Sequence, residues 1–151
     1  MDIITQLHIC AELFLAFILG GLIGFERERA GIPAGVRTFS AVAVGACLFS
    51  IVSSHALGHY DSTRIAAQVA SGMGFLGAGV IFKHGDLIRG LTTAGVLWAS
   101  SAVGISVGFQ LYIVAVFTTF LLVFMLHVSK YKAWRRMMKK SYRTTSTKNE
   151  F

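Results

Sequence analysis

The sequence predicts an all-α polytopic membrane protein with five transmembrane helices, its N-terminus outside and its C-terminus cytoplasmic. The chain has 151 residues, of which 54% are apolar and only 14% are charged, whereas about 25% of the residues in a soluble domain are charged. The apolar residues form five blocks of helix length, and the basic residues gather at alternate ends of these blocks. The composition argues against a soluble globular fold, and the blocks and charges predict the helix number and orientation.

Each apolar block is long enough to cross a bilayer as a helix. A helix rises about 1.5 Å per residue, so about 20 residues cross the roughly 30 Å of hydrocarbon. The predicted helices are residues 9–25, 38–57, 65–82, 91–109 and 111–128. Nearly all charges before residue 129 fall in the short connections or near the N-terminus, and Glu12, inside the first helix, is the exception.

The distribution of Lys and Arg predicts the orientation, because these residues accumulate on the cytoplasmic side of short loops. The first and third connections and the segment after residue 128 hold 13 of them, and the other side holds only Arg64. This asymmetry places the N-terminus outside and requires an odd number of crossings. The predicted organisation is a five-helix transmembrane domain over residues 1–128 and a basic cytoplasmic tail over residues 129–151.

The tail accounts for the net charge of the protein. It carries eight basic residues and one acid, which equals the +7 of the whole chain. Its aromatic residues and Met138 recur at helical spacing among the basic ones, so we expect an amphipathic helix on the anionic inner leaflet, followed by a disordered end. The alternative partner of this tail is an acidic protein surface, and nucleic acid is not a predicted partner.

Glycines are concentrated in the third predicted helix, at Gly72, Gly74, Gly77 and Gly79. Residues 72–77 match the letters of the dinucleotide motif GxGxxG, but that motif needs a preceding strand and a helix that opens at the glycines. The run instead indicates a helix surface without side-chain bulk, against which another helix can pack. The alternative is a helix that breaks at membrane depth and lines a substrate path.

Pairs of glycines four residues apart occur in two other helices. Gly20 and Gly24 lie in the first, and Gly104 and Gly108 lie in the fourth. We therefore expect the first, third and fourth helices to pack tightly.

Charged and polar residues at the helix ends are candidate functional residues, since a charge near hydrocarbon is costly unless it is paired, reaches the interface or has a function. Glu26 and Glu28 are interpreted either as interfacial anchors with local ion pairs or as partners of Arg37, which begins the second helix. Thr92 and Thr93 lie among the small residues at the start of the fourth helix.

On the other predicted side of the membrane, Asp61 and Arg64 are three residues apart and share a face of the third helix if it begins near residue 62. Gln68 follows on that face and is expected to point into the bundle. Glu12 either pairs with Arg64 or faces a water-filled cavity, and the sequence leaves both open.

The sequence predicts no enzyme, no metal site and no cofactor. The five histidines are scattered over both predicted sides of the membrane and form no HExxH motif. No nucleophile or acid–base pair can be placed from the sequence.

Four sequence blocks resemble the signature blocks of the MgtC/SapB family of bacterial inner-membrane proteins. They are residues 20–28, 33–38, 64–81 and 90–94 with Trp98 and Ala99, in the order of the family. The resemblance implies a plasma-membrane protein of stressed bacteria, linked to magnesium limitation, acid stress and survival inside phagocytes, which restrains membrane machinery such as ATP synthase. It implies neither an enzyme nor magnesium transport. The residues that it singles out are Glu26, Glu28, Arg37, Thr38, Arg64, Gln68, the glycines of the third helix, Thr92 and Thr93.

The short segment after the fifth helix resembles the membrane-only form of the family, because the longer, virulence-associated members continue into a soluble domain. We expect a multi-pass regulator of the inner membrane that contacts a larger membrane complex through its helices and forms homo-oligomers. The alternative is a small oligomeric transporter or channel for an ion or small solute.

Overall fold

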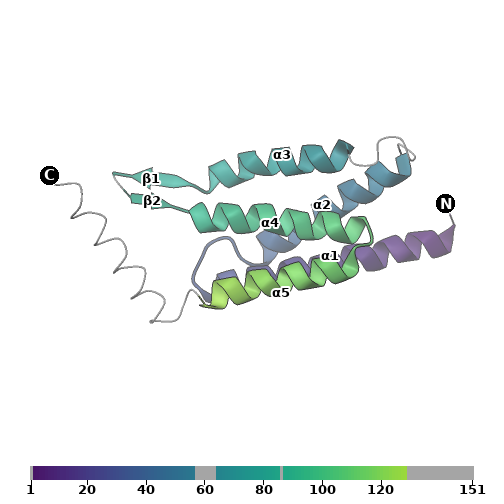
Figure 1. The fold of residues 1–151 in the computed structure, drawn as a ribbon, viewed down its shortest axis with the longest axis horizontal. Coiled ribbons are helices and arrows are strands. Elements are labelled where there is room, and N and C mark those ends of the chain that lie inside the picture. The colour runs from purple at the N-terminus through teal and green to yellow at the C-terminus, as the bar shows by residue number, and fades with distance from the viewer. Residues whose placement is uncertain (1, 57–63, 86, 129–151) are drawn as a thin grey trace.

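The structure, a computed structural model, describes residues 2–56, 64–85 and 87–128. Its elements are α1 (Ile3–Arg29), α2 (Val36–Ala56), α3 (Arg64–Gly79), β1 (Phe82–His84), β2 (Leu87–Arg89), α4 (Leu91–Gly108) and α5 (Tyr112–Val128). The helices lie side by side along the long axis of the molecule, and the chain runs back and forth between its two ends (Figure 1). The end that carries the two strands is called the hairpin end below, and the end near the N-terminus is called the opposite end.

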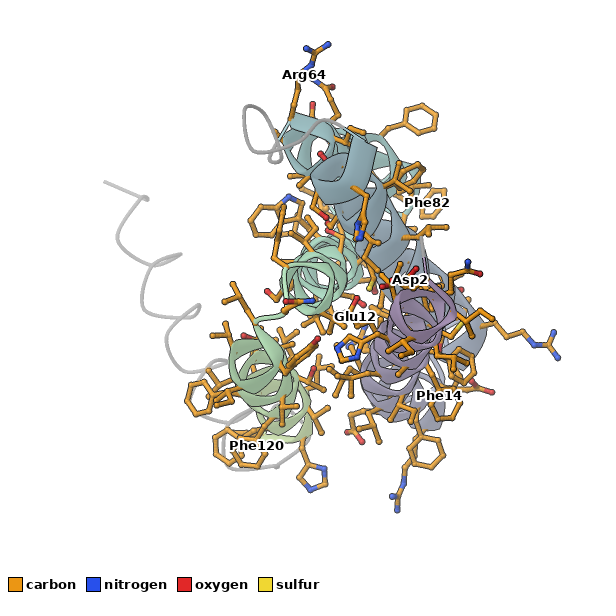
Figure 2. The ribbon with its side chains drawn as sticks, turned by 90° about the vertical axis from the view of Figure 1, so that its right-hand side faces the viewer. Asp2, Glu12, Phe14, Arg64, Phe82 and Phe120 are labelled. Carbon is orange, nitrogen blue, oxygen red and sulfur yellow. The ribbon has the colours of Figure 1, made fainter. Side chains whose placement is uncertain are left out.

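In the described part of the chain, three helices are long and apolar enough to cross a membrane: α1, α4 and Val36–His55 of α2. The apolar α5 has 17 residues and α3 has 16. Large apolar side chains cover the outside of the bundle, and Phe14 of α1 and Phe120 of α5 point away from it (Figure 2). Such a surface matches lipid and not water, so the fold is that of a helical membrane protein.

The third connection differs from the sequence prediction, which expected helices alone. α3 ends at Gly79 and not at Phe82, and the chain then forms an antiparallel hairpin in which Phe82 pairs with Arg89. Gly85 and Gly90 have positive φ angles of 59° and 89°, which glycine adopts without the strain that a side chain causes. The short strands and glycine turns end the helical segment early.

The other helix boundaries lie within a few residues of the predicted ones, except in α1. Residues 26–29 continue α1 as helix, although the prediction ended that helix at Phe25. Glu and Arg are good helix formers, so charge alone does not end a helix that leaves the hydrocarbon. This extension puts Glu26, Arg27 and Glu28 on a rigid element.

α4 lies at the centre of the bundle, where it contacts each of the other four helices. Its buried residues therefore point in several directions, and they include the polar Thr93, Ser100 and Ser101. α1 and α2 pack on each other and on α4, while α3 rests on α4 and α2, and α5 rests on α4 and α1. α3 and α5 thus form two edges of the bundle.

The closest contacts join α2 to α1 and to α4 at glycines. A Cβ atom added at Gly20 would lie 2.6 Å from the carbonyl oxygen of Phe39, and one added at Gly108 would lie 2.6 Å from that of Cys47. A Cβ at Gly24 would lie 2.6 Å from the Cα of Val36, and one at Gly104 would overlap the Ala43 carbonyl. The glycines of the first and fourth helices therefore pack on α2. Of the predicted packing among the first, third and fourth helices, α4 does contact α1 and α3, but α1 and α3 are not close neighbours.

Hydroxyl groups reinforce these contacts. The Ser40 Oγ of α2 donates to the carbonyl oxygen of Phe17 in α1 at 3.2 Å, and the Ser100 Oγ of α4 donates to that of Phe39 in α2 at 3.4 Å. Hydrogen bonds of this kind join transmembrane helices where small residues let the backbones approach.

We predict that Gly20→Ala lowers the free energy of unfolding by about 1–3 kcal/mol, because the added methyl overpacks a backbone contact. Gly45→Ala is the matched control, since a Cβ at Gly45 meets no atom of the described residues within 4 Å, and it should be neutral or stabilising by up to about 1 kcal/mol. Unfolding in mixed micelles with increasing sodium dodecyl sulfate measures both. Equal effects of the two substitutions would contradict this packing.

Candidate functional site

The charged residues of α1 and their hydrogen-bond partners lie at the two ends of the bundle. The end of α1, the start of α2, the start of α4 and the end of α5 meet at the hairpin end. At the opposite end, α1 meets the turn between α4 and α5. Each cluster joins elements that are far apart in the sequence.

A buried arginine joins α1 to α4 at the hairpin end. Nη2 of Arg27 donates to Oγ1 of Thr93 at 3.0 Å, and the two residues are only 9% and 7% exposed. Nε of Arg27 is buried and has no hydrogen-bond partner among the described residues. A buried guanidinium is costly unless its charge and donors are compensated, so this position is unusual for an arginine that serves only as an interfacial anchor.

The acids on either side of Arg27 contact two different elements. Oε1 of Glu26, which is buried, lies 3.6 Å from Nδ1 of His127 near the end of α5. Oε2 of Glu28 accepts the backbone N–H of Val36 at 3.1 Å and thereby caps the start of α2. Three consecutive residues of α1 therefore contact three other helices: Glu26 contacts α5, Arg27 contacts α4 and Glu28 contacts α2.

The predicted partnership of these acids with Arg37 is replaced by the contact of Glu28 with the α2 backbone. Arg37 and Thr38 are exposed. The contact needs Gly35, since a Cβ added there would lie 2.5 Å from Oε2 of Glu28. The turn around Pro33 thus brings the start of α2 to Glu28 of α1, which caps it.

At the opposite end, Glu12 is 5% exposed and accepts two hydrogen bonds. Nε2 of Gln110 donates to its Oε1 at 3.2 Å, and the hydroxyl of Tyr112 donates to the same oxygen at 2.6 Å. Gln110 lies between α4 and α5 with a φ of 63°, the positive-φ residue other than glycine in the described chain. Glu12 therefore holds this turn against α1.

The pairing of Glu12 with Arg64, one of the two sequence interpretations, is wrong. Arg64 is exposed at the start of α3, at an edge of the molecule away from Glu12 (Figure 2). Glu12 instead lines a pocket of about 220 Å³ together with His8, Ala11, Leu15 and Tyr112. Asp61, the predicted neighbour of Arg64, lies outside the described residues, as does the predicted tail.

α3 presents its polar and glycine positions outward. Gln68 is exposed and does not point into the bundle as predicted, because α3 lies at an edge of the bundle. A Cβ added at Gly72, Gly74 or Gly79 meets no described atom within 4 Å, and only Gly77 faces a neighbour, 3.6 Å from the Cβ of Ala94. α3 is one continuous helix over Arg64–Gly79, so the alternative of a helix broken at its glycines does not hold.

Sequence reasoning missed Arg27, Gln110 and Tyr112. Arg27 follows the buried positions Gly20 and Ile23 at intervals of seven and four residues, and this helical period was the signal that it belongs to the buried stripe of α1. Thr92 and Thr93 were both predicted as functional residues, but Thr92 is exposed and only Thr93 is buried. No pattern in the sequence around Gln110 and Tyr112 indicated that they hydrogen-bond to Glu12.

Comparison of the whole chain with known proteins identifies its family. A family model described as the MgtC family matches residues 13–133, which include α2 to α5 and most of α1. The chain belongs to the MgtC family. This membership confirms the resemblance seen in the signature blocks, and it covers Arg27, Thr93 and the Gln110–Tyr112 turn.

Relatives in the MgtC family come from several bacteria. Protein MgtC of Brucella abortus (strain 2308) is 55% identical over 101 residues, which are 67% of this chain and 42% of that protein. Protein MgtC of Salmonella typhimurium (strain LT2) is 48% identical over 97 residues, or 64% and 42%. An uncharacterized protein of Haemophilus influenzae is 43% identical over 134 residues, or 82% and 56%. The chain spans about half the length of these relatives, and no solved structure matches it.

We predict that Tyr112→Phe and Glu12→Gln are coupled in stability by about 0.5–3 kcal/mol, because Tyr112→Phe removes the donor of their hydrogen bond and Glu12→Gln removes the negative charge of its acceptor. The measurement is a double-mutant cycle of unfolding free energies in mixed micelles. Tyr112→Phe with Glu28→Gln is the control pair, since Glu28 lies at the hairpin end, and it should be additive within about 0.5 kcal/mol. Equal coupling in the two cycles would contradict the assigned contact.

Proposed function

We propose that this chain is a multi-pass inner-membrane protein of bacteria that serves adaptation to stress by regulating another membrane protein. Membership of the MgtC family supports the stress-related role, and the long apolar helices support the location. We infer that regulation proceeds through contact between α3 and a transmembrane helix of the regulated protein. It involves no chemical transformation and no cofactor.

The exposed glycine face of α3 is the observation that carries this proposal. Gly72 and Gly79, seven residues apart, share one face of this helix. They leave its backbone bare, with no described atom within 4 Å of their Cβ positions. Phe75 beside them is 84% exposed. Lipid tails offer helices no hydrophobic driving force to associate, so association depends on close backbone approach at small residues. α3 offers such a surface at the edge of the bundle, where another helix can reach it.

The distribution of charge supports the proposed orientation. The described basic residues Arg29, Lys83 and Arg89 lie at the hairpin end, and Arg64 lies at the opposite end. By the excess of basic residues in cytoplasmic loops, we place the hairpin end in the cytoplasm and the N-terminus outside. The pocket beside Glu12 then faces the outer side.

The alternative of an oligomeric transporter has lost part of its sequence support. It relied on a path lined by the third helix, Gln68 and the threonines of the fourth helix. In the structure α3 is continuous, Gln68 is exposed and the Thr93 hydroxyl accepts the hydrogen bond of Arg27. Contact between helices of different proteins accounts better for a bare face on α3.

We predict that Gly72→Leu abolishes growth support under magnesium limitation and the co-purification of a larger membrane protein, because the new side chain blocks close approach on α3. Gly95→Leu is the matched control, since Gly95 is an exposed glycine of α4 and its Cβ position also has no described atom within 4 Å. Both variants should accumulate and elute like the unaltered protein. Capture from mild detergent and growth assays measure the outcome.

Two results would contradict the regulatory role. One is a Gly72→Leu variant that supports growth as well as the Gly95→Leu variant does. The other is a capture that returns only this chain, together with flux of an ion or phosphate through reconstituted liposomes, which would favour the transporter.

A further inference from the structure

A pocket of about 410 Å³ opens at the hairpin end of the molecule. One wall is apolar and comes from the α1–α2 connection, the end of α3 and β1, and the other comes from the start of α4. Its lining residues are Ile32, Pro33, Ala34, Val80, Phe82, Arg89, Gly90 and Thr93. The volume lies within the range of about 300–1,000 Å³ that is common for small-molecule sites.

The polar wall of this pocket is electropositive. The lining contains one charged residue, Arg89, and it contains no acid among the described residues. α4, a helix of 18 residues, begins at this wall with Gly90 as its N-cap and has no side-chain cap. The first N–H groups of a helix have no partner inside the helix and carry a partial positive charge. Such a terminus attracts anions and can donate hydrogen bonds to them.

Arg27 provides the second and independent indication of an anion. Its guanidinium is buried and directed at Thr93, a lining residue, to which Nη2 donates at 3.0 Å. Its Nε has no hydrogen-bond partner among the described residues. Buried polar groups are nearly always hydrogen-bonded, and an exception requires an explanation such as an ion or ligand. Glu26, the preceding residue, is also buried and attracts the Arg27 cation, and a negative charge beside Thr93 would compensate that cation on the side of the pocket.

Gly90 gives the pocket its shape. A Cβ at this position would overlap the carbonyl oxygen of Val80, and its φ is 89°. The glycine therefore lets β2 turn directly into α4 and keeps Arg89 beside the first turn of the helix. A larger residue here would move Arg89 and Thr93 apart.

We propose that this pocket binds an anion that carries a phosphate group on an apolar stem. The phosphate lies at the start of α4 between Arg89 and Thr93. The positive charge of Arg27, which hydrogen-bonds to Thr93, attracts it. The stem lies against Ile32, Val80 and Phe82. The anion comes either from the headgroup of an anionic phospholipid or from a soluble phosphate compound, and the site does not depend on the proposed contact of α3 with a partner.

The test titrates purified protein in a neutral detergent with dihexanoyl phosphatidylglycerol and, separately, with inorganic phosphate. Calorimetry measures affinity, and hydrogen exchange measures protection of the amides of residues 91–94. Saturable binding of phosphatidylglycerol alone identifies the lipid, and displacement of it by inorganic phosphate identifies a site for soluble phosphates as well. Both results support the proposal.

Substitutions locate the site. Arg89→Gln and Thr93→Val should each weaken binding about 10- to 100-fold, the effect of one hydrogen bond to a charged group. Arg29→Gln removes an exposed charge from the same end of the molecule and should change affinity by no more than about twofold. Arg89 is exposed, so its variant reports on binding even if Thr93→Val impairs folding.

Three outcomes would overturn the proposal. The first is no binding of either probe, and the second is an equal effect of Arg29→Gln and Arg89→Gln, which would indicate a diffuse charged surface. The third is equal affinity for dihexanoyl phosphatidylcholine, which has the same apolar chains and phosphodiester but no net charge.

Discussion

The close approach of the α2 backbone to the backbones of α1 and α4 is the contact on which the other features of this protein depend. It is possible because Gly20 and Gly24 face α2 from one side and Gly104 and Gly108 face it from the other. In lipid such contacts rest on dispersion and on short hydrogen bonds, which weaken steeply with distance. α1, α2 and α4 therefore form a fixed core whose two ends place the polar residues.

The polar clusters follow from that core. Arg27 reaches Thr93 because α1 and α4 both pack on α2 at the hairpin end, and Glu12 reaches the Gln110–Tyr112 turn because the same two helices meet at the opposite end. α3 takes no part in the glycine contacts with α2, and most of its own glycines face outward. Glycine thus permits the close contacts inside the core and leaves a bare face on α3.

The helices could be predicted from the sequence because each is a long apolar block, and that signal is local. The hairpin could not, because strands of three residues have too short a pattern to compete with the apolar run that precedes them. Arg27 was hidden by the alternating charges around it, although its spacing from Ile23 placed it on the buried face of α1. The partners of Glu12 and the outward direction of Gln68 depend on which helices are neighbours, and helix order in a bundle is not a local property of the sequence.

The central claim is that the glycine face of α3 contacts another protein in the membrane, whereas exposed glycines elsewhere do not. Photo-cross-linking in intact cells tests it directly, with the reactive amino acid placed at position 72 in one variant and at position 95 in the other. The account predicts an adduct with a second polypeptide from position 72 and only lipid adducts from position 95. Lipid adducts alone from both positions, or the same polypeptide from both, would contradict it.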